Sequence, residues 1–137
     1  MLDNWGYEKL AKVVMDWAKV EMKHVDALLD RILFLGGMPI VSKLNAIQIG
    51  PNVKDQFEND LAAEMEAVED YNEAIHEADS ENDATTQNLL EDNVKDENDH
   101  INYIEAQLSQ IEQMSLENYL SIISDWGNYH ERRKTRF

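Results

Sequence analysis

The sequence predicts an all-α fold, and three observations favour this class. Helix-favouring residues such as Ala, Leu, Glu, Lys and Gln fill long segments that contain few β-branched runs. The helix breakers, five Gly and two Pro, are sparse and gather mainly at 36–39 and 50–51. Apolar residues recur at spacings of three and four, and the alternation typical of half-buried strands is absent. We therefore expect three long helices and a short fourth helix in a single domain over residues 1–137.

The breakers predict the bounds of the first two helices. The first helix should run from about Trp5 to Leu35 and end at the glycine pair 36–37, because glycine favours the position just after a helix. A loop of about fourteen residues should follow, which is long enough to cross the bundle instead of turning back. Pro51 suits a first helical turn, so the second helix should extend from Pro51 to about Asp79.

Capping residues delimit the later helices. The polar segment 79–83 suits a tight turn, after which the third helix should run to about Gln113. Ser115 can cap a short helix that begins at Leu116 and ends near Trp126.

The charge and composition of the chain exclude several classes of function. A formal net charge of −16 leaves no basic surface for a nucleic-acid backbone, so no nucleic-acid partner is expected. The absence of cysteine excludes disulfides, iron–sulfur clusters and thiol chemistry. With no recognisable signal peptide and no apolar stretch of bilayer length, we expect no membrane partner and a cytoplasmic location. The basic tail 131–137 is interpreted as a solvated or partly disordered terminus, with a specific function as the alternative.

Acidic and imidazole side chains occur within the apolar stripes of all three long helices. Burying them as bare charges would be costly unless they pair or bind a cation. No inward Lys or Arg accompanies them, so we predict a divalent metal, and this ligand set suits iron or manganese. The stripes are Leu10, Val14, Trp17, Glu21, His24, Leu28 and Leu35; Phe57, Leu61, Glu64, Val68, Tyr71, Ile75 and Ala78; and Leu90, Val94, Glu97, Ile101, Ile104, Leu108 and Ile111, with His100 one turn from Glu97.

Two of these carboxylate and imidazole pairs have a spacing that suits metal binding. Glu21 with His24 and Glu97 with His100 both form Glu-x-x-His, which places the two groups one helical turn apart. Such pairs occur in di-iron carboxylate bundles, although the motif alone has low specificity. The alternative is a core histidine satisfied by the glutamate of its own helix. Two pairs together with Glu64 favour metal binding over that alternative.

A third copy of the motif, Glu73-Ala-Ile-His76, is predicted to lie on the surface. Glu73 follows Tyr71 by two residues, which is about 200° around the helix from the apolar stripe.

The first helix has a second apolar stripe, which needs a partner of its own. A helix that is apolar on two faces requires two partners, and a two-fold contact between copies would supply one and bring Met22 near its own copy. Periodicity alone assigns Met22 to gap-filling core. The stripe consists of Met15, Ala18, Met22, Val25, Leu29 and Leu33.

One long run and several shorter ones resemble a known family. The long run is Glu21-Met-Lys-His24-Val-Asp-Ala-Leu-Leu-Asp-Arg31-Ile-Leu-Phe-Leu-Gly-Gly-Met-Pro39. The shorter ones are Asn4-Trp-Gly6, Lys43-Leu-Asn45 with Ile49-Gly50, Asp60-Leu-Ala-Ala-Glu64, Glu73-Ala-Ile75 with Ala78-Asp-Ser80, and Asp99-His-Ile101 with Asn118-Tyr-Leu120. Together they closely resemble the bacterioferritins, the haem-containing branch of the ferritin superfamily.

The resemblance implies a ferritin-like four-helix-bundle fold whose N-terminal helix is largely missing here, with three long helices plus a short C-terminal helix. It also implies a di-iron site. Glu21 and Glu97 match the carboxylates that bridge the two irons. His24 matches the imidazole on one iron, and Glu64 with His100 match the terminal ligands of the other.

The resemblance further implies a cofactor, an activity and partners. Met22 matches the axial methionine of a haem b shared across a two-fold axis. The activity would be that of a ferroxidase, which oxidises Fe(II) to Fe(III) with dioxygen or peroxide and so stores and detoxifies iron. The implied partners are further copies in a homo-oligomer, namely a shell of 24 subunits built from two-fold dimers, together with a complete bacterioferritin subunit and a bacterioferritin-associated ferredoxin.

The chain departs from the family at its start and along the first helix. In the family an additional first helix donates a glutamate to the iron on the His24 side, so we expect that iron site to be incomplete here. Asp16 and Val20 stand where the family has acidic and histidine positions of accessory iron sites. A late start codon, a degenerate copy, or a variant completed by another subunit would explain the difference, and we favour the first two. The rival hypothesis is a catalytically impaired haem-binding or shell-building subunit, in which only a mononuclear Glu64/His100 site survives.

Overall fold

Three long helices and one short helix make up the part of the chain that the structure, a computed structural model, describes: residues 2–42, 46 and 48–124. The long helices are α1 (Glu8–Phe34), α2 (Val53–Ser80) and α3 (Ala84–Met114), and the short helix covers 116–124. No strand occurs among these residues. The all-α class and the expected number of helices are confirmed. The predicted end of the short helix at Trp126 and the basic tail lie outside the described residues.

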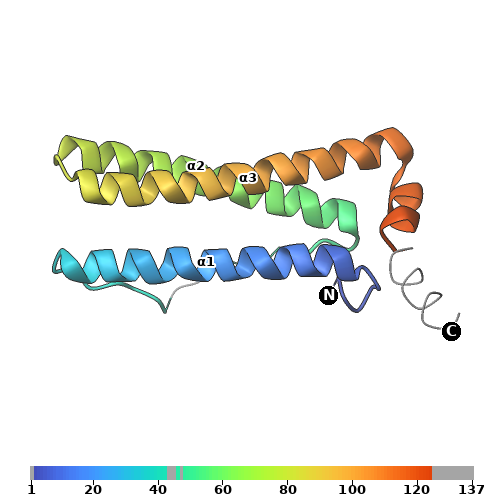
Figure 1. The fold of residues 1–137 in the computed structure, drawn as a ribbon, viewed down its shortest axis with the longest axis horizontal. Coiled ribbons are helices and arrows are strands. Elements are labelled where there is room, and N and C mark those ends of the chain that lie inside the picture. Colours follow the sequence, from blue (N-terminus) through green and yellow to red (C-terminus); the bar gives the residue numbers. More distant parts are fainter. Residues whose placement is uncertain (1, 43–45, 47, 125–137) are drawn as a thin grey trace, which may run out of the picture.

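The helices are arranged as an antiparallel hairpin with a third helix beside it. Helices α2 and α3 run in opposite directions and pack against each other along much of their length (Figure 1). Helix α1 lies alongside, runs parallel to α2 and packs less extensively on α3. Because α1 and α2 are parallel, the connection between them returns along the length of the bundle, as the predicted long loop requires.

Helix α1 ends as predicted but begins later than predicted. At its end, Gly36 has φ +81, its amide donates to the Leu33 carbonyl at 3.0 Å, and the Gly37 amide donates to the Ile32 carbonyl at 2.8 Å. This pair of hydrogen bonds is the Schellman arrangement that glycine favours. The predicted start at Trp5 was wrong, because residues 2–6 form turns and Gly6, at φ +83, cannot continue a right-handed helix.

Side-chain caps delimit the later helices. Asn52, not Pro51, precedes the first residue of α2, and its side chain accepts a hydrogen bond from the Asp55 amide at 3.0 Å. The predicted start at Pro51 was therefore wrong by two residues. Ser115 precedes the short helix, and its hydroxyl accepts from the Asn118 amide at 3.5 Å, as the capping prediction requires.

The apolar core lies at one end of the bundle, where α1 and α2 begin and α3 ends. Its buried members are Leu2, Leu10, Val53, Phe57, Ile104, Ile111 and Tyr119. The buried polar residues, in contrast, come from the middle of the helices: His24, Asn93, Glu97 and His100. One predicted inward residue, Leu35, lies past the end of α1 and is exposed. The middle of the bundle therefore buries polar side chains where apolar ones would ordinarily pack.

An ion pair ties the far end of α1 to the turn between α2 and α3. The Arg31 guanidinium donates from Nη2 to both carboxylate oxygens of Asp83, at 2.7 and 2.8 Å, and from Nε to the Thr86 hydroxyl at 2.7 Å. Asp83 also caps α3 through the Thr86 amide at 3.1 Å. Arg31 first, and then Thr86, hold the pKa of Asp83 below its usual range. Helix α1 is thus held at its first residues by the apolar core and near its end by this pair.

No helix within the described ranges is long and apolar enough to cross a membrane.

Candidate metal centre

The structure brings together the five side chains that the apolar stripes predicted. Glu21 and His24 come from the middle of α1, Glu64 from the middle of α2, and Glu97 and His100 from the middle of α3. The closest approaches between an imidazole nitrogen and a carboxylate oxygen range from 3.3 to 3.6 Å. The two imidazoles and Glu97 are almost wholly buried.

Two of the carboxylates span the two imidazoles. Glu21 places Oε2 3.4 Å from Nδ1 of His24 and Oε1 3.6 Å from Nδ1 of His100. Glu97 places Oε1 3.5 Å from Nδ1 of His24 and Oε2 3.4 Å from Nδ1 of His100. Each carboxylate therefore offers one oxygen to each imidazole. These side chains could therefore offer ligands to a cation beside each histidine, with both carboxylates facing both places.

The two positions are not equivalent. Of the two imidazoles, Glu64 approaches His100 and not His24, with Oε1 3.3 Å from Nδ1 of His100. Glu21, Glu64, Glu97 and His100 can each offer one ligand atom, with all four atoms within 4.8 Å of one another. His24 lies outside that group of four. The His100 side therefore has one more carboxylate than the His24 side.

The polar atoms that face the centre lack hydrogen-bond partners. Glu21 Oε1, His24 Nδ1, Glu97 Oε2 and His100 Nδ1 are all buried and accept or donate no hydrogen bond. Leaving four buried polar atoms unsatisfied at one point is costly, because each loses its hydration and gains nothing in return. Bound cations would satisfy all four atoms at once. Imidazole nitrogen and carboxylate oxygen form a donor set that fits iron or manganese.

A carboxylate outside the centre orients His24. Nε2 of His24 lies 2.9 Å from Oδ2 of Asp96, which is half-exposed. In the neutral tautomer whose Nε2 donates to Asp96, the lone pair of His24 lies on Nδ1, the nitrogen near Glu21 and Glu97. Carboxylates commonly hold metal-binding imidazoles in this way.

Aromatic rings cover the His100 side. Trp17 stacks on the His100 ring with centroids 4.4 Å apart and an interplanar angle of 30°. Tyr103 meets Trp17 edge-on at 5.2 Å. These rings keep the His100 ring in place and exclude water from one side of the centre.

The pKa shifts reflect burial and, after it, a concentration of negative charge that forms no ion pair with a lysine or arginine among the described residues. Burial raises the pKa of Glu64 to about 9, and the neighbouring carboxylate of Glu97 adds to this effect. Burial and the Glu97 carboxylate likewise raise the pKa of Glu21. Burial opposes the charged form of His24, but the hydrogen bond with Asp96 and the carboxylates nearby outweigh it, so its pKa is raised. Shifts of this kind are common at functional sites.

The other predicted residues lie away from this centre. Glu73 and His76 are exposed on α2, as the helical positions predicted. Met22 is 59% exposed and lies on a different face of α1 from His24. Several other members of the second stripe are also exposed, namely Met15, Val25 and Leu33.

Sequence reasoning missed Asp96 and the specific role of Trp17. Asp96 precedes Glu97 directly and lies 72 residues from His24 in the chain, so only the packing of α1 on α3 reveals the pair. Trp17 appeared as one more apolar residue of a stripe. A periodic pattern shows which face a residue occupies but not which side chain on another helix it meets.

Comparison with known proteins identifies close relatives. The family model described as "Ferritin-like domain" matches residues 1–114. A bacterioferritin of Mycobacterium avium is 40% identical over 119 residues, which cover 87% of this chain and 75% of the relative. A bacterioferritin of Mycobacterium tuberculosis is 36% identical over the same share of both chains. A bacterioferritin of Streptomyces coelicolor is 36% identical over 121 residues, which cover 88% of this chain and 72% of the relative.

Proposed function

The chain belongs to the bacterioferritin family of ferritin-like proteins, and on this premise we propose that it stores iron and oxidises Fe(II) to Fe(III) at the centre described above. One observation supports a two-iron site most directly: Glu21 and Glu97 each divide their two oxygens between the two imidazoles. That geometry suits two Fe(II) ions held side by side as substrate.

The protein groups would contribute mainly electrostatics and position. Each Fe(II) gains one positive charge when it passes one electron to dioxygen or peroxide. Glu21, Glu64 and Glu97 supply negative charge at fixed positions, which favours the more highly charged product. Burial strengthens this effect because little water screens it. In the tautomer whose Nε2 donates to Asp96, Nδ1 of His24 offers its lone pair to the metal. The strongly acidic chain also concentrates cations near its surface.

A second candidate function follows from the asymmetry of the centre. The His100 side has a carboxylate of its own, Glu64, whereas the His24 side has only the two shared ones. A subunit that binds one cation between Glu64 and His100, without fast oxidation, would fit this asymmetry. Its role would then lie in shell building or haem binding.

Anaerobic addition of Fe(II) followed by oxygen distinguishes the two functions. We expect the chain to bind two Fe(II) per subunit and to oxidise them in a fast phase. The ultraviolet absorption of the ferric product measures the rate of this phase. One bound Fe(II) per subunit and no fast phase would support the impaired subunit, and no bound iron would contradict both. Asp99→Asn, an exposed carboxylate on the same helix as His100, serves as the control and should leave the stoichiometry unchanged.

Met22 is proposed as a haem ligand shared between two copies. Its thioether is exposed on an apolar face with Met15 and Val25, which supports a contact across a two-fold axis. When bound, haem b would supply one-electron chemistry, and Met22 of each copy would hold it through its thioether. The complete shell of 24 subunits, a complete bacterioferritin subunit as partner, and the bacterioferritin-associated ferredoxin stay predictions.

Met22→Leu should abolish the absorption spectrum of bis-methionine haem in protein reconstituted with haem, because leucine fills the same space without a sulfur ligand. Met15→Leu, at an equally exposed methionine of the same stripe, should keep that spectrum. Size-exclusion chromatography of both variants reports whether assembly survives. A bis-methionine spectrum that persists in Met22→Leu would refute the role of Met22.

A further inference from the structure

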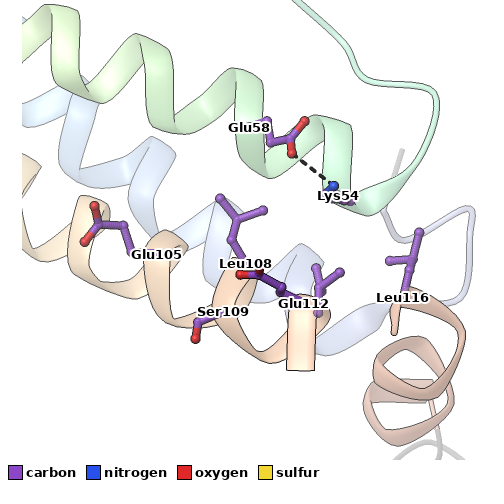
Figure 2. A pocket seen from close by; sticks show the side chains of 8 residues that line it. Lys54, Glu58, Glu105, Leu108, Ser109, Glu112 and Leu116 are labelled. Atoms are coloured by element: carbon purple, nitrogen blue, oxygen red, sulfur yellow. Dashed lines mark ion pairs between the residues drawn. The ribbon is translucent and has the colours of Figure 1, made fainter. Parts of the chain in front are cut away.

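A groove of about 680 Å³ lies between the first turns of α2 and the last turns of α3, on a part of the surface that the cation centre does not use (Figure 2). Its apolar part is formed by Leu108, Ile111 and Leu116. The carboxylates of Glu58 on α2 and of Glu105 and Glu112 on α3 also line the groove. The groove therefore combines an apolar floor with an acidic rim.

The negative charge of this rim is poorly balanced. Lys54, the one lysine that lines the groove, pairs with Glu58 at 3.4 Å. Glu105 and Glu112 form no ion pair with any described residue. The last turn of α3 contains no basic residue, so its carbonyl groups add partial negative charge at the same end. A basic segment with some apolar surface would complement the groove in both respects.

The chain itself contains such a segment. Residues 131–137 read Glu-Arg-Arg-Lys-Thr-Arg-Phe and carry four of the 12 basic residues of the protein. They also end in an aromatic side chain, Phe137. In a chain with a net charge of −16, this is the largest local concentration of positive charge.

The segment can reach the groove within one chain. The short helix 116–124 begins at Leu116, which lines the groove. Tyr119 fixes this helix against α3, because it is 1% exposed and its hydroxyl donates to Oε1 of Gln107 at 2.8 Å. The helix rises by about 12 Å from residue 116 to residue 124. The six residues 125–130 can span about 20 Å when extended, which is enough to return over that distance.

We propose that the basic segment 131–137 docks in the groove of its own chain. The arginine and lysine side chains pair with Glu105 and Glu112, and the apolar floor receives the aromatic end. Each exposed ion pair of this kind is weak. Several of them at one concave site can together hold a segment that is tethered to the same chain.

Zero-length cross-linking of the full chain with a carbodiimide tests this docking, because the reagent joins a lysine amine only to a carboxylate in direct contact. In an equal mixture of ¹⁴N-labelled and ¹⁵N-labelled chains at low salt, we expect Lys134 to link mainly to Glu105 or Glu112, with both peptides from one isotope. The yield should fall by about tenfold in high salt, which screens exposed charge pairs. Links spread evenly over exposed carboxylates would refute the docking. Links that mainly join different isotopes would replace it with docking on a second copy.

Thermal unfolding gives an independent readout. The triple change Arg132→Gln, Arg133→Gln and Lys134→Gln should lower Tm by about 3 °C in the unaltered chain. The same triple change should have no effect in a chain that already carries Glu105→Gln and Glu112→Gln, because the two sets of charges then no longer interact. In a control chain with Glu69→Gln and Glu73→Gln, two exposed carboxylates of α2, the full effect should persist. An equal effect in all three backgrounds would contradict the proposal.

Discussion

Glu97→Gln should abolish tight cation binding at both positions of the centre, although the change removes a single charge. Glu97 offers one oxygen to each histidine, and it is 1% exposed, so no water can take its place easily. A glutamine has one oxygen and cannot serve two cations. Since the loss of a group that merely orients a ligand typically costs 10–100-fold in affinity, the loss of a shared ligand should cost at least about 100-fold. Equilibrium dialysis with Co(II), monitored by its visible absorption, measures the stoichiometry and the affinity.

Glu64→Gln provides the matched comparison, because the chemical change is identical and the helix position is equally central. Glu64 approaches His100 alone, so this variant should lose the cation on the His100 side and keep the other. The expected number of tightly bound cations per subunit is two for the unaltered chain, one for Glu64→Gln and none for Glu97→Gln. If Glu97→Gln keeps one tight site, Glu97 does not bridge two cations.

Glu64→Gln should also make the metal-free protein more stable at neutral pH. The pKa of Glu64 is raised from 4.5 to about 9 in the folded chain, so folding there requires uptake of a proton between these two values. The contribution of the Glu64 carboxyl group to the free energy of unfolding is therefore fully present below pH 4.5. This contribution is lost as the pH rises towards 9. Glutamine is neutral throughout and removes this penalty, with a gain on the order of 1 kcal/mol at pH 7.

Thermal unfolding in the presence of a chelator, followed by circular dichroism from pH 5 to pH 8, measures this effect. The unaltered chain should lose stability with rising pH more steeply than Glu64→Gln does. Glu69→Gln, at an exposed position of α2, should follow the unaltered chain. With saturating Co(II), the unaltered chain should become more stable than Glu64→Gln, because it binds the cation more tightly and bound cation stabilises the folded protein. A Glu64→Gln variant that is less stable than the unaltered chain across this pH range would contradict the account.

The periodicity of the sequence predicted the helices and the group of five side chains well, for a physical reason. A stripe of residues at spacings of three and four must face the same way on a helix, so Glu21, Glu64 and Glu97 could be placed inward from the sequence alone. Helix ends were less predictable. The start of α1 moved from Trp5 to Glu8 because the left-handed conformation of Gly6 depends on the turns before it.

Contacts between helices could not be predicted in the same way. The division of the Glu21 oxygens between two imidazoles depends on the distance and the rotation of α1 relative to α3. So does the pairing of His24 with Asp96. No spacing within one helix encodes these quantities. They are set by the packing of the helices against each other.

Helix α1 is attached to the rest of the bundle at several places along its length. The polypeptide secures this helix near its two extremities, through the apolar core at Leu10 and through the Arg31–Asp83 pair, whereas Glu21 and His24 sit midway between these anchors. A cation bound by Glu21 and His24 would join the middle of α1 to the neighbouring helices. Metal loading would then reinforce the link that His24 and Asp96 already make between α1 and α3, and it would also restrict the motion of α1.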